Sequence, residues 1–117
     1  MAKHTEPRFY LQLKKKYPDY FGAVEALGKA VHNSGPLDMK ITNLVQLAAA
    51  AAIRSEGAVH SHVRRALEAG ATADEVDHVL ISLTSTIGFP NVIAALSWAA
   101  DVVGAQKSGK KPSRQKK

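Results

Sequence analysis

Five histidines are the side chains of this sequence best suited to acid–base or metal chemistry: His4, His32, His60, His62 and His78. No two of them stand four residues apart, the spacing that places two metal ligands on one face of a helix. His60 and His62 would point about 200° apart around a helix. Asp74 and His78 have the four-residue spacing, but they lie off the apolar stripe of their segment and are expected to be solvated. We therefore expect no metal site and no cofactor. The histidines near the N-terminus and at the first predicted turn are assigned no role.

Several classes of function are excluded by what the sequence lacks. There is no cysteine, which excludes disulfides, thiolate metal sites, iron–sulfur clusters and thiol redox chemistry. The longest apolar run, residues 47–53, has seven residues, far fewer than the roughly 18 that a membrane span needs. No apolar region follows Met1-Ala2-Lys3, so a secretory signal is not expected. We therefore expect a cytoplasmic protein that does not enter a membrane.

The net charge of +6 is concentrated at the C-terminus. Residues 107–117 carry six of the sixteen basic side chains and no acidic one, whereas residues 1–106 carry ten of each kind. A segment so rich in Lys, Ser, Gly and Pro cannot bury enough apolar surface to order itself. The sequence therefore predicts a helical domain over residues 1–105 and a disordered basic tail over residues 106–117. Because the body has no basic face, no specific nucleic-acid partner is expected.

Apolar residues recur at spacings of three and four through most of the body, which is the period of amphipathic helices. Asp38 is placed as an N-cap, and Thr72 with Glu75 forms a capping box. Gly70 is placed to end a helix, and Gly57 to interrupt one. The predicted fold is all-α, a compact bundle of five to six helices over residues 8–13, 18–31, 39–56, 60–69, 76–87 and 90–103.

Alanines are concentrated at two places in the predicted helices, in an unbroken run over residues 48–52 and again over residues 94–100. Alanine lets neighbouring helices approach closely but supplies little apolar area, and a domain of this size needs more burial than that. We expect the chain to obtain this burial by self-association. Tight packing within one chain, or the high helix propensity of alanine, would account for the same residues.

A series of motifs in fixed order carries a resemblance to a known family. His62-Val63-Arg64-Arg65-Ala66 is followed by Ala69-Gly70, by the Thr72–Glu75 capping box, and about 26 residues after His62 by Gly88-Phe89-Pro90. This order resembles the carboxymuconolactone decarboxylase family and its alkylhydroperoxidase D-like relatives, over about residues 9–103. The resemblance implies the family's helical fold and a homo-oligomer, either a trimer or a hexamer assembled from dimers.

One branch of that family is a thiol peroxidase, and this sequence departs from its pattern. Aligned on His62, the two cysteine positions of that branch fall on Ser55 and Ala58, and its glutamate falls on Asn43. A serine hydroxyl cannot cycle through a disulfide, and alanine cannot resolve one. Thiol-dependent peroxide reduction is therefore not expected.

The decarboxylase branch needs no cysteine, and the resemblance suggests roles for five side chains. His62 is predicted to be the catalytic proton donor, because the pKa of a histidine lies near neutrality. Arg65 (or its neighbour Arg64) would hold a substrate carboxylate. Neutral hydrogen bonds to the substrate would come from the remaining three, Asn43, Gln46 and Ser55.

These assignments leave the function open between two classes. The chain is either a lyase that acts on a small carboxylated lactone or related acid, or a catalytically silent, oligomeric binding or scaffold member of the superfamily. At the residue level, His62 fits equally a buried histidine that donates to a carbonyl. Ser55 as a nucleophile activated by His62 is disfavoured, since no third, orienting acid is evident.

Overall fold

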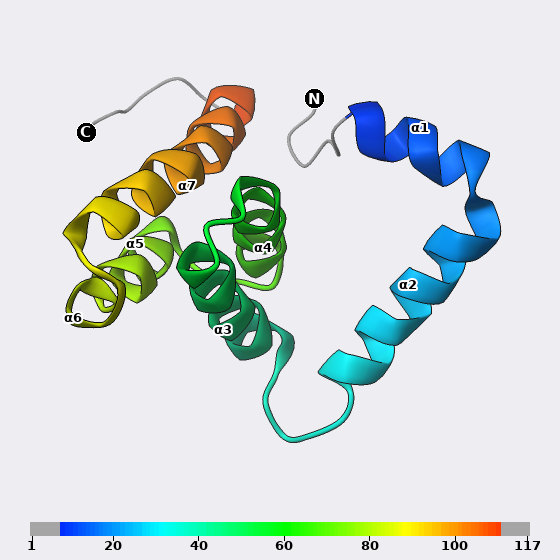
Figure 1. Ribbon diagram of the computed structural model, residues 1–117, viewed down its shortest axis with the longest axis horizontal. Coiled ribbons are helices and arrows are strands. Elements are labelled where there is room, and N and C mark those ends of the chain that lie inside the picture. The colour runs from blue at the N-terminus through cyan, green and yellow to red at the C-terminus, as the bar shows by residue number, and fades with distance from the viewer. Residues whose placement is uncertain (1–7, 111–117) are drawn as a thin grey trace.

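Every regular element in the described part of the chain, residues 8–110, is an α-helix (Figure 1). The prediction of an all-α fold is confirmed. Within that range, no helix is both long enough and apolar enough to cross a membrane. In this computed structural model the helices are α1 (Arg8–Lys16), α2 (Pro18–His32), α3 (Met39–Ala52), α4 (Glu56–Glu68), α5 (Ala73–Ile81), α6 (Thr84–Ile87) and α7 (Phe89–Lys110).

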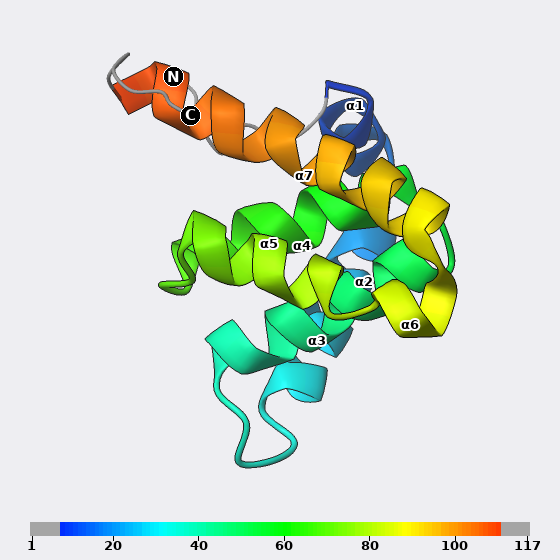
Figure 2. The ribbon, with the colours of Figure 1, turned by 90° about the vertical axis from the view of Figure 1, so that its left-hand side faces the viewer.

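The hydrophobic core lies between α3, α4, α5 and α7. Figure 2 shows α7 crossing over α4 and α5, with α3 on the opposite side of that pair. Ala95 and Ala99 of α7 are fully buried, as is Ala66 of α4, so these small residues let the helices approach closely. Packing within one chain therefore accounts for these alanines. The larger fully buried side chains of the core are Leu47, Val59, Val63, Val76 and Leu80.

Helices α1 and α2 form an arm that lies beside the α3–α7 body (Figure 1). The two helices are joined at Pro18, which opens α2 where a missing N–H costs nothing. Phe21 is buried at their junction, where its ring meets the ring of Tyr10 edge-on at 5.1 Å and that of Tyr20 at 5.4 Å. The rest of α2 is exposed on one side and faces a cavity on the other.

The boundary between α3 and α4 differs from the prediction. The break falls at residues 53–55, not at Gly57, which is the second residue of α4. Arg54 takes a left-handed conformation (φ 58°), and the amide of Ser55 donates to the carbonyl of Ala50 at 3.0 Å. The Ser55 hydroxyl then accepts the N–H of Ala58 at 3.3 Å and caps α4. The predicted interruption at Gly57 is therefore wrong, because a side-chain cap at Ser55 starts the new helix earlier.

The predicted cap at Asp38 and the predicted signals at Gly70 and Thr72 are confirmed, whereas α1 continues to Lys16, beyond its predicted end at residue 13. Thr72 and Glu75 make both bonds of the capping box, each at 3.0 Å. Gly70 and Gly88 have φ values of 104° and 90°, which glycine adopts without strain and other residues rarely reach. Segment 76–87 is split between α5 and α6.

The C-terminal helix is longer than expected. The predicted last helix stops at residue 103, whereas α7 continues to Lys110 and so covers the beginning of the predicted tail. The predicted disorder is therefore wrong for residues 106–110, which continue the helix. The remaining part of the tail prediction, residues 111–117, lies outside the described residues.

Candidate functional site

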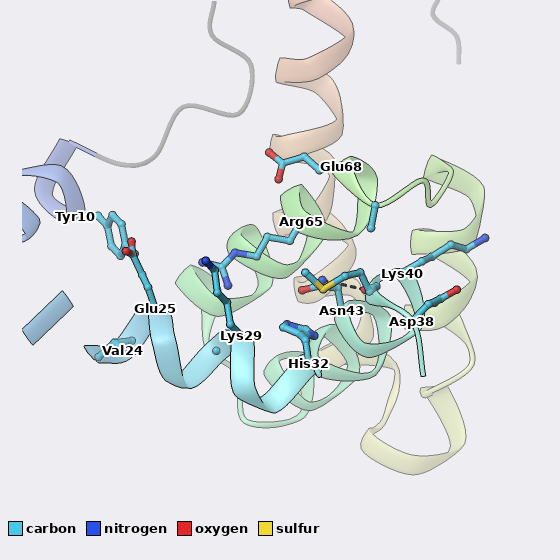
Figure 3. A pocket seen from close by; sticks show the side chains of 13 residues that line it. Tyr10, Val24, Glu25, Lys29, His32, Asp38, Lys40, Asn43, Arg65 and Glu68 are labelled. Carbon is cyan, nitrogen blue, oxygen red and sulfur yellow. Dashed lines mark hydrogen bonds between the residues drawn. The ribbon is translucent and has the colours of Figure 1, made fainter. Parts of the chain in front are cut away.

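A cavity of about 740 Å³ lies between α2 on one side and α3 and α4 on the other (Figure 3). We call it the α2 cavity. Its polar lining includes side chains from three helices that are distant in sequence: Lys29 and His32 from α2, Asn43 from α3, and Arg65 from α4. Figure 3 shows these side chains projecting into the space between the helices. A volume of this size accommodates a small organic molecule.

Asn43 is the one polar residue buried in the core of the described chain, with 1% of its surface exposed. Its amide nitrogen donates to the carbonyl of Met39 at 3.0 Å. Its amide oxygen lies 3.3 Å from Nδ1 of His62 and accepts from it. Because an amide oxygen cannot donate, His62 carries its proton on Nδ1 and leaves a lone pair on Nε2. Asn43 thus fixes the tautomer of the half-buried histidine.

The electrostatic surroundings of His62 favour its neutral form. Burial lowers the pKa of His62 below 6.5, and the positive charges of Arg65, His32 and Arg64 lower it further. Both causes penalise the imidazolium, the first by removing water and the second by repulsion between like charges. His62 is therefore neutral at pH 7.

Two cations, Lys29 and Arg65, line the α2 cavity, and their charges add to the effect of Lys14 in lowering the pKa of Glu25. Lys29 and Arg65 form no ion pair and no hydrogen bond with any residue that the structure describes. By contrast, Lys40 is paired with Glu75 at 3.1 Å.

Three acids also line the cavity: Glu25, Asp38 and Glu68. Glu25 pairs with Lys14 at 2.8 Å. Asp38 caps α3 by accepting the N–H of Ile41 at 2.9 Å. The α2 cavity therefore presents two cations that make no direct ion pair with a described residue, next to the carboxylates of Glu25 and Glu68. Cations placed in this way can bind an anion.

The structure brings together some of the predicted site residues and separates others. Asn43 and Arg65 line the α2 cavity. His62 is not among the residues that line it and is linked to it through its hydrogen bond to Asn43. Gln46 lies on α3 but is not among the residues that line the cavity, and Ser55 caps α4 instead. Their predicted roles toward a substrate remain predictions, with Asn43, His62 and Arg65 as the group that shares one location.

Sequence reasoning missed the contribution of α2. His32 was assigned no role because it stands near a turn, yet it lines the α2 cavity beside Lys29. Its Nδ1 lies within hydrogen-bonding distance of the Thr42 hydroxyl, which ties the end of α2 to α3. No local pattern marks these residues, since their location depends on how the turn after α2 folds the arm back.

A second polar cluster lies away from the α2 cavity, where α4 meets α7. It consists of Glu56, His60 and Asp101. Glu56 and His60 are four residues apart on α4, so the sequence already showed two possible metal ligands at the spacing of one helix face. A search for pairs of histidines alone could not find it.

The comparisons with known proteins agree with this fold. A model of the carboxymuconolactone decarboxylase family matches residues 18–101. An uncharacterised protein of Methanocaldococcus jannaschii is 34% identical over 106 residues, which is 91% of this chain and 99% of that protein. The crystal structure of an apo carboxymuconolactone decarboxylase family protein from Legionella pneumophila superimposes with a TM-score of 0.70. It covers 84% of this chain and 88% of its own at 22% identity, a likeness that concerns the fold.

Proposed function

Because this chain belongs to the carboxymuconolactone decarboxylase family, we propose that it binds a small carboxylate in the α2 cavity and acts on it as a lyase. The observation that carries the proposal is the pair of cations Lys29 and Arg65, which make no direct ion pair with a described residue and lie in one cavity with the buried Asn43 amide and His32. A carboxylate would satisfy both charges, and a charge-assisted hydrogen bond to Arg65 is worth about 1.5–3 kcal/mol.

The chemistry of decarboxylation fits the groups that surround the α2 cavity. Loss of carbon dioxide from a carboxylated lactone breaks the bond between the ring and the carboxyl carbon. The electron pair stays on the ring and spreads onto the lactone carbonyl as an enolate. Positive charges beside the ring stabilise that enolate, and Lys29 and Arg65 supply them.

A proton must then reach the ring carbon, and we assign its transfer to His62. A lowered pKa makes the protonated form of His62 a stronger acid than an ordinary imidazolium. Because His62 is neutral at pH 7, Nε2 first takes up a proton from solvent, and the imidazolium then gives this proton to the ring carbon and returns to the neutral form. Asn43 is a positioning residue in this scheme, because it holds Nδ1 and leaves Nε2 to exchange the proton.

The test is release of carbon dioxide from a γ-lactone carboxylate by the full chain. We expect turnover by the wild type and a loss of at least about a hundredfold in His62→Asn, which is the scale of acid–base catalysis by one group. His32→Asn is the matched comparison, since His32 lines the same cavity. If His32→Asn abolishes turnover and His62→Asn does not, the proton transfer belongs to His32.

The second candidate function is a catalytically silent oligomeric module, and a different observation supports the association of copies that it requires. Four apolar side chains of α2 recur at helical spacing and are 47–65% exposed: Tyr20, Val24, Leu27 and Val31. A contiguous apolar stripe on a helix that stands beside the body is typical of an association surface. We propose that a second copy of the chain covers it, in a trimer or a hexamer. This assembly is compatible with either function. If the chain binds an acid and releases no carbon dioxide from it, the lyase proposal is wrong and the silent module is the function that stands.

A further inference from the structure

Three possible metal ligands converge where α4 packs against α7. Glu56 and His60 stand one turn apart on α4, and Asp101 faces them from α7. Nε2 of His60 lies 3.1 Å from the Asp101 carboxylate and 4.0 Å from that of Glu56. All three ligand atoms lie within 4.8 Å of one another.

An ion pair with His60 does not account for this arrangement. Nε2 carries at most one proton, so it can donate to only one of the two carboxylates. Bringing Glu56 and Asp101 this close together also costs repulsion between like charges. Both carboxylates are more than half exposed, and exposed ion pairs add little stability.

The geometry points to a divalent transition-metal site at Glu56, His60 and Asp101, with Zn²⁺ as the ion that suits one imidazole and two carboxylates. Ligand atoms around Zn²⁺ at about 2.1 Å lie roughly 3–3.5 Å apart. The His60–Asp101 distance already has that value, and the exposed Glu56 side chain needs only a small adjustment. The exposure leaves the remaining coordination positions to water. The site is separate from the α2 cavity and does not rest on the function proposed for it.

Calorimetric titration of the full chain with ZnCl₂ tests the proposal. We expect the wild type to bind one Zn²⁺ at this site, and His60→Ala to weaken that binding at least tenfold. Asp101→Asn and Glu56→Gln should weaken it as well, because each removes a charged ligand. His78→Ala is the matched control, since His78 is an exposed histidine on another helix, and it should bind like the wild type.

A second readout follows from the position of the site between two helices. Zn²⁺ bound there would tie α4 to α7 and raise the melting temperature of the wild type but not of His60→Ala. Trp98, the single tryptophan of the chain, lies three residues before Asp101 on α7 and gives a fluorescence signal close to the site. Failure of the wild type to bind Zn²⁺, or equal binding by wild type and His60→Ala, would overturn the proposal.

Discussion

At the scale of single residues, His62 and Asn43 act as one unit. The buried amide is held by the Met39 carbonyl, and it in turn holds Nδ1 of His62. A neutral histidine with one fixed nitrogen is suited to proton exchange at the other. The same unit also fits a purely structural role, so stability and activity must be measured on the same variants.

The lowered pKa of His62 predicts a specific dependence of stability on pH. Between the ordinary pKa of 6.5 and the lower pKa in the fold, the unfolded chain binds more protons at this residue than the folded chain does. The free energy of unfolding therefore falls as pH drops below 6.5, and the loss levels off below the folded pKa. His62→Asn should flatten that part of the curve and change stability at pH 7 by no more than about 1 kcal/mol.

Urea unfolding across pH 5–7.5 checks this, with His78→Asn as the control that should follow the wild type. Superimposable curves for wild type and His62→Asn would contradict it. A loss of roughly 1–3 kcal/mol at pH 7 would instead indicate a structural histidine whose partners are left unpaired.

The sequence predicted the candidate site residues on α3 and α4, but it did not predict those on α2. Asn43, His62 and Arg65 were found because the family's order of motifs fixes their positions. Lys29 and His32 were not found, because their place at the cavity results from the turn after α2 and from no local pattern. Ser55 was interpreted as a substrate contact, although a serine before a new helix is equally the signal of an N-cap.

At the scale of elements, the helix ends depend on which local signal dominates. The capping box at Thr72 and the glycine at position 70 meet no competing signal nearby. The start of α5 and the end of α4 could therefore be predicted from the sequence. Between α3 and α4 two signals compete. The Ser55 cap and the left-handed Arg54 define the break, and Gly57 lies inside a helix that it does not interrupt.

Two glycine substitutions test this boundary. An added Cβ at Gly57 meets nothing within 4 Å and lies in a helix, so Gly57→Ala should raise the free energy of unfolding by about 0.4–1 kcal/mol. At Gly70, φ is 104°, a conformation that is strained for alanine. Gly70→Ala should therefore lower the free energy of unfolding by roughly 1–2 kcal/mol. Chemical denaturation of both variants makes the comparison. Destabilisation by Gly57→Ala as large as that by Gly70→Ala would show that the chain breaks at Gly57.

At the scale of the whole molecule, the arm is the part of the chain whose apolar surface is least covered. Leu27, at the centre of the α2 stripe, is 64% exposed. A glutamate there would bring a charge into the proposed contact between copies. Leu27→Glu should therefore reduce the mass of the particle in solution towards that of a single chain. Ala26→Glu is the matched control, because position 26 is exposed on the same helix but lies off the stripe. Light scattering after size exclusion measures both, and a monomeric wild type at micromolar concentration would contradict the proposed association.

In the proposed function, the α2 cavity binds a carboxylate through Arg65. Calorimetric titration with a γ-lactone carboxylate and with its uncharged methyl ester tests it most directly, in the wild type, Arg65→Gln and Arg64→Gln. Arg64 is adjacent in sequence but does not line the cavity, so its variant is the control.

We expect the wild type and Arg64→Gln to bind the acid and not the ester. Arg65→Gln should bind the acid at least tenfold more weakly, since the lost interaction is worth about 1.5–3 kcal/mol and 1.4 kcal/mol is a factor of ten. Equal binding of acid and ester, or unchanged affinity in Arg65→Gln, would contradict it.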